Sequence, residues 1–167
     1  MNLDIRLSRD EDLDVIVELS LLAWEPVFRS FEQVLGRNIY KLIWPNWREQ
    51  QAEGVASVCK DREKFTVLVA DADGVVAGFI AYELKLEEKK GEVYLLAVHP
   101  DYQNRGVGTA LNNAALDKMR ESGIALVSVE TGGDPGHAPA RRSYEKAGYT
   151  GLPIVRYFQD LSERSLS

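Results

Sequence analysis

Gln103, Gly106 and Gly108 lie within six residues of one another, shortly after an apolar run that ends at Pro100. A glycine-bearing loop between a strand and a helix can bind an anion. The first turn of a helix has unpaired N–H groups and the positive end of the helix dipole, and glycine lets a phosphate approach the backbone closely. Residues 93–111 therefore predict a site for a phosphorylated ligand.

Two other phosphate-binding loops do not fit this spacing. A P-loop needs G-x-x-x-x-G-K-[S/T], which the chain lacks. A dinucleotide-binding loop needs G-x-G-x-x-G, and Leu111 stands where the third glycine is required. The remaining pattern is Q-x-x-G-x-G, which Gln103, Gly106 and Gly108 satisfy.

The periodicity of apolar residues predicts one domain over residues 1–167, of the α/β (α+β) class. Its central sheet should be mixed, largely antiparallel and flanked by helices, and Gly78 predicts a bulge or a close backbone approach within it. Pro26 should end or kink the first helix. Strands are expected at about 3–7, 65–70, 75–86, 92–98, 124–129 and 155–158, and helices within 8–60 and at about 106–122 and 139–147.

Composition excludes several classes of partner. The net charge of −6 and the pI near 5.0 argue against nucleic acid, which requires clustered lysine and arginine. No apolar run approaches the roughly 20 residues that span a bilayer, and the N-terminus lacks a signal-peptide pattern, so we expect no membrane association and a cytoplasmic protein. One cysteine, Cys59, and two histidines make a metal site unexpected, and Cys59 is interpreted as a packing residue.

In its setting, the glycine pattern resembles the cofactor motif of the GNAT family, the acyl-CoA-dependent N-acetyltransferases. The C-terminal half carries a second matching pattern, A-x-x-x-Y-x-x-x-G-[F/Y], at Ala140, Tyr144, Gly148 and Tyr149. The resemblance covers about residues 65–160, which would form the acetyl-CoA-binding core. In the family, a helical region such as residues 8–60 usually shapes the acceptor site.

The resemblance implies that acetyl-CoA binds along residues 93–111 as a co-substrate, without a metal. Backbone amides of the loop would hold its pyrophosphate, and the pantetheine arm would pair with the preceding strand as an added strand does. His137 stands where many members have asparagine, and it would either hydrogen-bond the cofactor as that asparagine does or cap the loop. The residues implied in cofactor binding are Leu96, Ala97, Val98, Gln103, Asn104, Arg105, Gly106, Val107, Gly108, Thr109 and His137.

Acetyl transfer to an amine needs a base, a polarised carbonyl and a proton donor for the leaving thiolate. Glu92 begins the cofactor-binding strand at the position of the family's frequent catalytic glutamate, and strict alternation would place it on one sheet face with Tyr94, Leu96 and Val98. Glu130 is the reserve base, and either glutamate could be a solvated strand-end residue. Tyr144 is the candidate acid, with helix packing as its alternative.

The predicted function is transfer of an acetyl group from acetyl-CoA to the primary amine of a small molecule, directly and within a ternary complex. A protein N-terminal or lysine acetyltransferase is the alternative, and a non-catalytic acyl-CoA-binding domain is an alternative of another class. A homodimer is left open. Rings from the helical region would line the acceptor pocket or else form core: Trp24, Phe28, Tyr40, Trp44 and Trp47.

Overall fold

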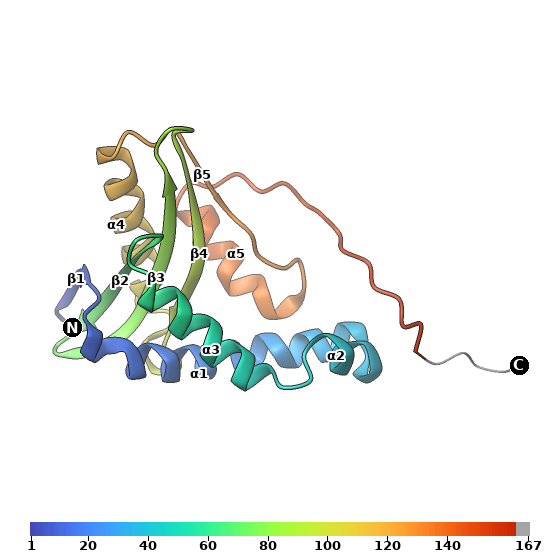
Figure 1. Ribbon diagram of the computed structural model, residues 1–167. Helices are drawn as coiled ribbons and strands as arrows, with labels where there is room; N and C mark the ends of the chain where they lie inside the picture. Colours follow the sequence, from blue (N-terminus) through green and yellow to red (C-terminus); the bar gives the residue numbers. More distant parts are fainter. Residues whose placement is uncertain (163–167) are drawn as a thin grey trace, which may run out of the picture.

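A five-stranded sheet with the strand order β1-β2-β3-β4-β5 forms the centre of the computed structural model, which describes residues 1–162 (Figure 1). The first four strands pair antiparallel, whereas β5 pairs parallel to β4. This confirms the predicted mixed, largely antiparallel sheet. The strands are β1 (Leu3–Leu7), β2 (Phe65–Ala72), β3 (Val75–Lys85), β4 (Lys90–Val98) and β5 (Leu126–Val129).

Helices cover both faces of this sheet. Helix α4 (Val107–Glu121) buries Val107, Leu111, Ala115 and Met119, spaced four residues apart, against one face. On the opposite face, α1 (Leu13–Leu35) and α3 (Trp47–Lys60) pack a second apolar core. That second core includes Ile16, Leu19, Val55, Val69, Phe79 and Ala81.

Pro26 neither ends nor interrupts the first helix, because α1 continues through it to Leu35. A proline inside a helix removes one N–H donor, and the carbonyl four residues earlier then needs water. Leu22, which carries that carbonyl, is exposed, so the missing bond is tolerated. Gly36, with φ of +78°, ends α1 and leads into the short α2 (Arg37–Ile43).

Gly78 brings β3 and β4 unusually close, as its position in the strand predicts. A Cβ atom there would lie 2.7 Å from the carbonyl oxygen of Ala97. The neighbouring register between β2 and β3 shifts at Ala70 and Asp71, which is the predicted irregularity.

The chain ends differently from the prediction. After α5 (Ala138–Lys146) and Gly148, which has φ of +94°, residues 149–162 form neither helix nor strand. The strand expected at 155–158 is therefore wrong: apolar composition favours a strand, but no sheet edge lies beside these exposed residues. Among the described helices, none combines the length and apolar composition that a membrane crossing requires.

Candidate functional site

Strands β4 and β5 separate to form a fork. Their parallel pairing runs only from Lys90 with Leu126 to Val93 with Val129. Pairing between β3 and β4 continues to Val98, so residues 94–98 have β3 on one side and an open edge on the other within the described chain. Figure 1 shows the chain after β5 diverging from β4 toward α5. The fork is a place where an extended ligand could add to the sheet.

The backbone of β4 directs hydrogen-bonding groups into this fork. The N–H of His99 donates to the carbonyl of Ala77 at 2.8 Å, and so points toward β3. In an antiparallel strand, neighbouring residues point their N–H and C=O groups to opposite sides. Leu96 and Val98 therefore direct theirs toward the fork, and the carbonyl of Val98 accepts a bond there from Gln103 Nε2 at 3.1 Å.

A bulge at Tyr94 changes which side chains share a face of β4. The register passes from Ala81 with Leu95 to Tyr82 with Val93, which leaves Tyr94 as the extra residue. Leu96 consequently packs in the core beneath α4. The expectation that Glu92, Tyr94, Leu96 and Val98 share one face is wrong, because the bulge interrupts the two-residue alternation. Glu92 instead lies on the face of α1 and α3, with Leu95 and Ala97.

The loop that follows β4 ends in a helix start with unpaired amides. Gly106 has φ of +82° and caps α4, a conformation that glycine adopts without strain. The N–H of Ala110 donates to the carbonyl of Gly106 at 2.9 Å, which is the first bond of the helix. The amides of Val107, Gly108 and Thr109 precede that bond and have no acceptor within the helix. This arrangement suits an anion at the open end of the fork.

Side chains of the loop have separate tasks. Gln103 ties the loop to β4 through Val98, and Asn104 has φ of +60° at the turn. Arg105 is exposed, and its guanidinium lies 5.8 Å from the ring centre of Tyr102, so it is free to move toward an anion. A Cβ at Gly108 would lie 3.5 Å from Ser143 Oγ, an ordinary contact.

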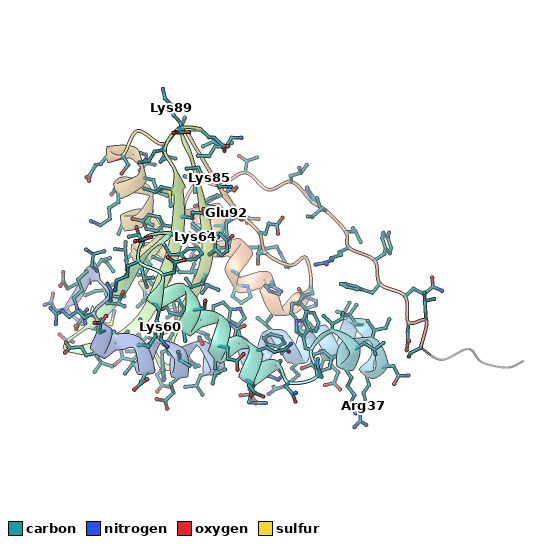
Figure 2. All side chains as sticks on the ribbon, in the orientation of Figure 1. Arg37, Lys60, Lys64, Lys85, Lys89 and Glu92 are labelled. Carbon is teal, nitrogen blue, oxygen red and sulfur yellow. The ribbon has the colours of Figure 1, made fainter. Side chains whose placement is uncertain are left out.

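Glu92 lies at the closed end of the fork, one residue before the last β4–β5 pair. It is half-buried, opposite Ser128 on β5 and Glu83 on β3. Figure 2 shows it on β4 below the hairpin tip that carries Lys89. Leu96 is four residues farther along the strand, but the bulge at Tyr94 reduces the span to three residues of β3, from Glu83 to Ile80. At 3.3 Å per residue this is about 10 Å. Glu130 directly follows β5 and is exposed.

Tyr144 is buried on α5 and packs edge-on against Tyr149, with ring centres 5.5 Å apart. Burial, and to a smaller extent Tyr149, raise the pKa of Tyr144 well above its ordinary value. Burial also raises the pKa of Tyr149 to about 12, and the Tyr149 hydroxyl has no hydrogen-bond partner in the described structure. Both phenols are therefore protonated at neutral pH and able to donate.

A partly buried network around His137 was not predicted from the sequence. Its Nδ1 hydrogen-bonds Asp134 Oδ1, and Asp134 Oδ2 accepts a bond from Ser30 Oγ on α1 at 2.6 Å. Arg141 donates to the carbonyls of Gly132 and Asp134 at 2.6 and 2.8 Å. The usable signal in the sequence was the glycine at position 132, because a Cβ there would collide with the Asp134 carboxylate. The network fixes the loop after β5 against α1.

The rings of the helical region mostly pack on one another. Phe28 stacks on Trp47 and Phe31 on Trp44, with centres 4.3 and 4.5 Å apart. Phe31 also contacts His137 at 5.2 Å, which joins this group to the loop beside the fork. Phe28 also meets Phe31 and Trp44 edge-on. Further ring contacts join Tyr40 with Trp44 and Trp24 with Phe79.

Cys59 lies on α3 and is buried in the core that α1 and α3 form against the sheet, as expected of a packing residue. Burial raises the pKa of its thiol to about 11. The thiolate that a covalent acyl intermediate would require is therefore scarce at neutral pH.

A model of the acetyltransferase (GNAT) family matches residues 36–149 of this chain. A mycothiol acetyltransferase of Sanguibacter keddieii is 38% identical over 88 residues, which cover 50% of this chain and 27% of that protein. The matched stretch is thus far less than two thirds of the length of the first curated relatives.

Solved structures share the fold. An acetyltransferase of the GNAT family from Desulfovibrio desulfuricans has a TM-score of 0.73 at 20% identity, covering 94% of this chain and 91% of its own. The PaiA N-acetyltransferase from Thermoplasma acidophilum, solved in complex with coenzyme A, has a TM-score of 0.70 at 22% identity. That match covers 90% of this chain and 91% of the other.

Proposed function

The chain belongs to the acetyltransferase (GNAT) family, and we propose that it moves an acetyl group from acetyl-CoA to the primary amine of a small molecule, directly and within a ternary complex. The observation that carries this proposal is the fork between β4 and β5, which ends at the unpaired amides of α4. An extended pantetheine arm and a pyrophosphate need these two features in this order.

Acetyl-CoA would bind through backbone more than through side chains. The fork-facing groups of Leu96 and Val98 would pair with the pantetheine amides beside Ala97, and the amides of the loop from Gln103 to Thr109 would hold the pyrophosphate. Arg105 would add a charge-assisted contact to phosphate. His137 has its Nδ1 committed to Asp134, so only its Nε2 is left for the cofactor or acceptor.

The proposed reaction forms one bond and breaks one. The amine nitrogen attacks the thioester carbonyl carbon, the C–N bond forms and the C–S bond breaks. Glu92 takes the proton that the amine loses, and Tyr144 supplies a proton to the leaving thiolate. The separation of about 10 Å along the strand between Glu92 and Leu96 supports a water relay for the first of these transfers, and Glu130 remains the reserve base.

A small cationic amine is the proposed acceptor. The aromatic group on α1, α2 and α3 reaches the fork through the contact of Phe31 with His137, and aromatic faces attract ammonium groups. The net charge of −6 favours a cation as well.

Release of free thiol from acetyl-CoA, screened over polyamines, aminoglycosides, amino acids and peptides, tests the proposal. We expect turnover with at least one small amine and an initial-rate pattern in which both substrates bind before product leaves. Turnover with peptides alone would indicate that the acceptor is a protein and not a small molecule. Binding of acetyl-CoA without turnover of any amine would support a non-catalytic domain and overturn the enzymatic proposal.

A further inference from the structure

Ser143 is a polar residue of α5 that no step of the proposed reaction uses. It directly precedes Tyr144, and its side chain is partly buried. Its Oγ accepts a hydrogen bond from Nδ2 of Asn112, on α4, at 3.2 Å. This bond uses the oxygen of Ser143 as an acceptor and leaves the hydroxyl hydrogen to be donated elsewhere.

The hydroxyl hydrogen of Ser143 has no acceptor among the described residues. A serine in a helix commonly returns this hydrogen to the backbone carbonyl three or four residues earlier. Ser20 and Ser122 both do so, at 2.6 and 3.0 Å. Ser143 makes no such bond within residues 1–162, and its contact with Asn112 runs in the other direction. Its donor is therefore available to a ligand.

Asn112 is a costly residue for the place that it occupies. It is fully buried, whereas the other buried residues of α4 are apolar, and its Oδ1 has no hydrogen-bond partner in the described structure. A buried amide with an unpaired oxygen destabilises the fold. Within the described chain, the bond from its Nδ2 to Ser143 is the side-chain contact that offsets this cost. An apolar residue would pack here at lower cost, so the amide suits a task other than packing.

The oxygen of Ser143 lies beside the first turn of α4. Gly108 and Asn112 are four residues apart and therefore lie on the same side of that helix. A Cβ at Gly108 would lie 3.5 Å from Ser143 Oγ and 3.6 Å from Cγ2 of Val98, the last residue of β4. The Ser143 hydroxyl, the end of the open edge of β4 and the unpaired amides of α4 therefore meet around Gly108.

We propose that Ser143 donates its hydroxyl hydrogen to an oxygen of acetyl-CoA on the pantetheine side of the pyrophosphate, and that Asn112 is the positioning residue that directs the hydroxyl there. Asn112 holds the Ser143 oxygen from within the core, so the hydrogen points away from the core. The inference rests on the proposed placement of acetyl-CoA, in which Val98 pairs with the pantetheine arm and the amides of α4 hold the pyrophosphate. It adds a side-chain donor to a site built mainly from backbone groups.

Calorimetric titration of the full chain with acetyl-CoA tests the contact. Ser143→Ala should weaken binding about three- to tenfold, the usual effect of losing one hydrogen bond. Ser143→Thr keeps the hydroxyl and should bind as the wild type does. Ser122→Ala, at the far end of α4, is the matched control and should also bind as the wild type does. An unchanged dissociation constant for Ser143→Ala would overturn the contact alone, whereas a wild type that does not bind acetyl-CoA would overturn the proposed function with it.

Two further ligands distinguish a direct contact from a disturbed helix start. Coenzyme A has the same junction of pantetheine and pyrophosphate, so Ser143→Ala should weaken its binding by the same factor. Adenosine 3′,5′-bisphosphate lacks the pantetheine arm and the phosphate that carries it, so its affinity should not change. A loss confined to acetyl-CoA, or an equal loss for the bisphosphate, would overturn the proposal.

Asn112→Leu tests the positioning role, because leucine fills the site and removes both polar atoms. The variant should be about as stable in urea as the wild type, since it also removes the unpaired oxygen. It should nevertheless weaken acetyl-CoA binding, and Ser143→Ala should add little to that loss in the double variant. Asn113→Leu, at the exposed neighbour on α4, is the matched control and should bind as the wild type does. Losses that multiply in the double variant would overturn the positioning role of Asn112.

Discussion

Asp134 holds His137 through one carboxylate oxygen and is itself held by Ser30 through the other, at 2.6 Å from Ser30 Oγ. Ser30 is on α1, whereas Asp134 and His137 lie in the loop between β5 and α5. These two contacts hold the irregular loop in a fixed position beside the fork. Its charge makes the loop sensitive to acid.

Asp134→Asn should reduce the free energy of unfolding by about 1–3 kcal/mol at neutral pH. Burial raises the pKa of the Asp134 carboxyl, but hydrogen bonds from Ser30 and His137 outweigh burial and hold that pKa below its ordinary value. A lowered pKa adds stability that is complete above about pH 4, the unfolded value, and is lost as the pH falls through the folded value. The free energy of unfolding that Asp134→Asn removes should therefore be smaller at pH 3 than at pH 7.

Urea unfolding at the two pH values measures this difference. Asp117→Asn is the matched control, because Asp117 pairs with Arg120 on the exposed side of α4 and should change stability by less than about 0.5 kcal/mol. An equal loss for Asp134→Asn at both pH values would show that its charge does not stabilise the loop.

Two substitutions of Gly108, at the start of α4, distinguish the effect of charge on acetyl-CoA binding from the effect of size. Gly108→Ala should leave acetyl-CoA affinity within a few-fold of wild type, since the added Cβ meets only ordinary contacts. Gly108→Asp should keep the fold, because an acidic residue is favourable in the first helical turn. It should nevertheless weaken acetyl-CoA binding at least tenfold, or about 1.4 kcal/mol, through repulsion of phosphate. Calorimetric titration of both variants measures the two affinities. Equal affinities would show that the pyrophosphate does not bind at the start of α4.

Glu92→Gln should lower kcat/KM by about 10²- to 10⁴-fold, the usual contribution of a general base, while the acetyl-CoA dissociation constant stays unchanged. Rates should be measured from pH 6 to 9, because an amine that is already neutral at high pH needs the base less. Glu83→Gln is the matched control, since Glu83 is the cross-strand neighbour of Glu92 on β3 and lies farther from the fork. If both variants behave alike, Glu92 is a solvated strand residue.

The strand, loop and helix at 93–111 were predictable because their signals are local. The strand has an apolar run, the turn has Pro100, and the helix start has Gly106. The bulge at Tyr94 was not predictable, because Tyr94 and Leu95 are both compatible with a regular strand and only pairing with β3 reveals the extra residue. A single inserted residue then reverses the face of everything after it.

Long-range contacts account for the other differences. Ser30 and Asp134 are 104 residues apart, and no local sequence pattern around either residue indicates that the two are in contact. The strand expected at 155–158 has the right composition but lacks a sheet edge beside it in the described structure, and composition alone does not show whether such an edge is present.

Tyr144→Phe should lower kcat by about 10- to 100-fold with little change in acetyl-CoA affinity. Removing the hydroxyl leaves the ring contact with Tyr149 intact, so packing should survive. The raised pKa of Tyr144 keeps it protonated across the working pH range, so the loss should not depend on pH between 6 and 9. Steady-state rates and thermal unfolding measure these effects together.

Tyr149→Phe is the matched control for Tyr144→Phe, because it removes a buried hydroxyl that has no partner in the described structure. An unpaired buried polar group costs stability, so this variant should be as stable as the wild type or slightly more stable. Its kcat should stay within a few-fold of wild type. If Tyr149→Phe loses activity and Tyr144→Phe does not, the proton donor is Tyr149, and Tyr144 only packs α5 against the sheet.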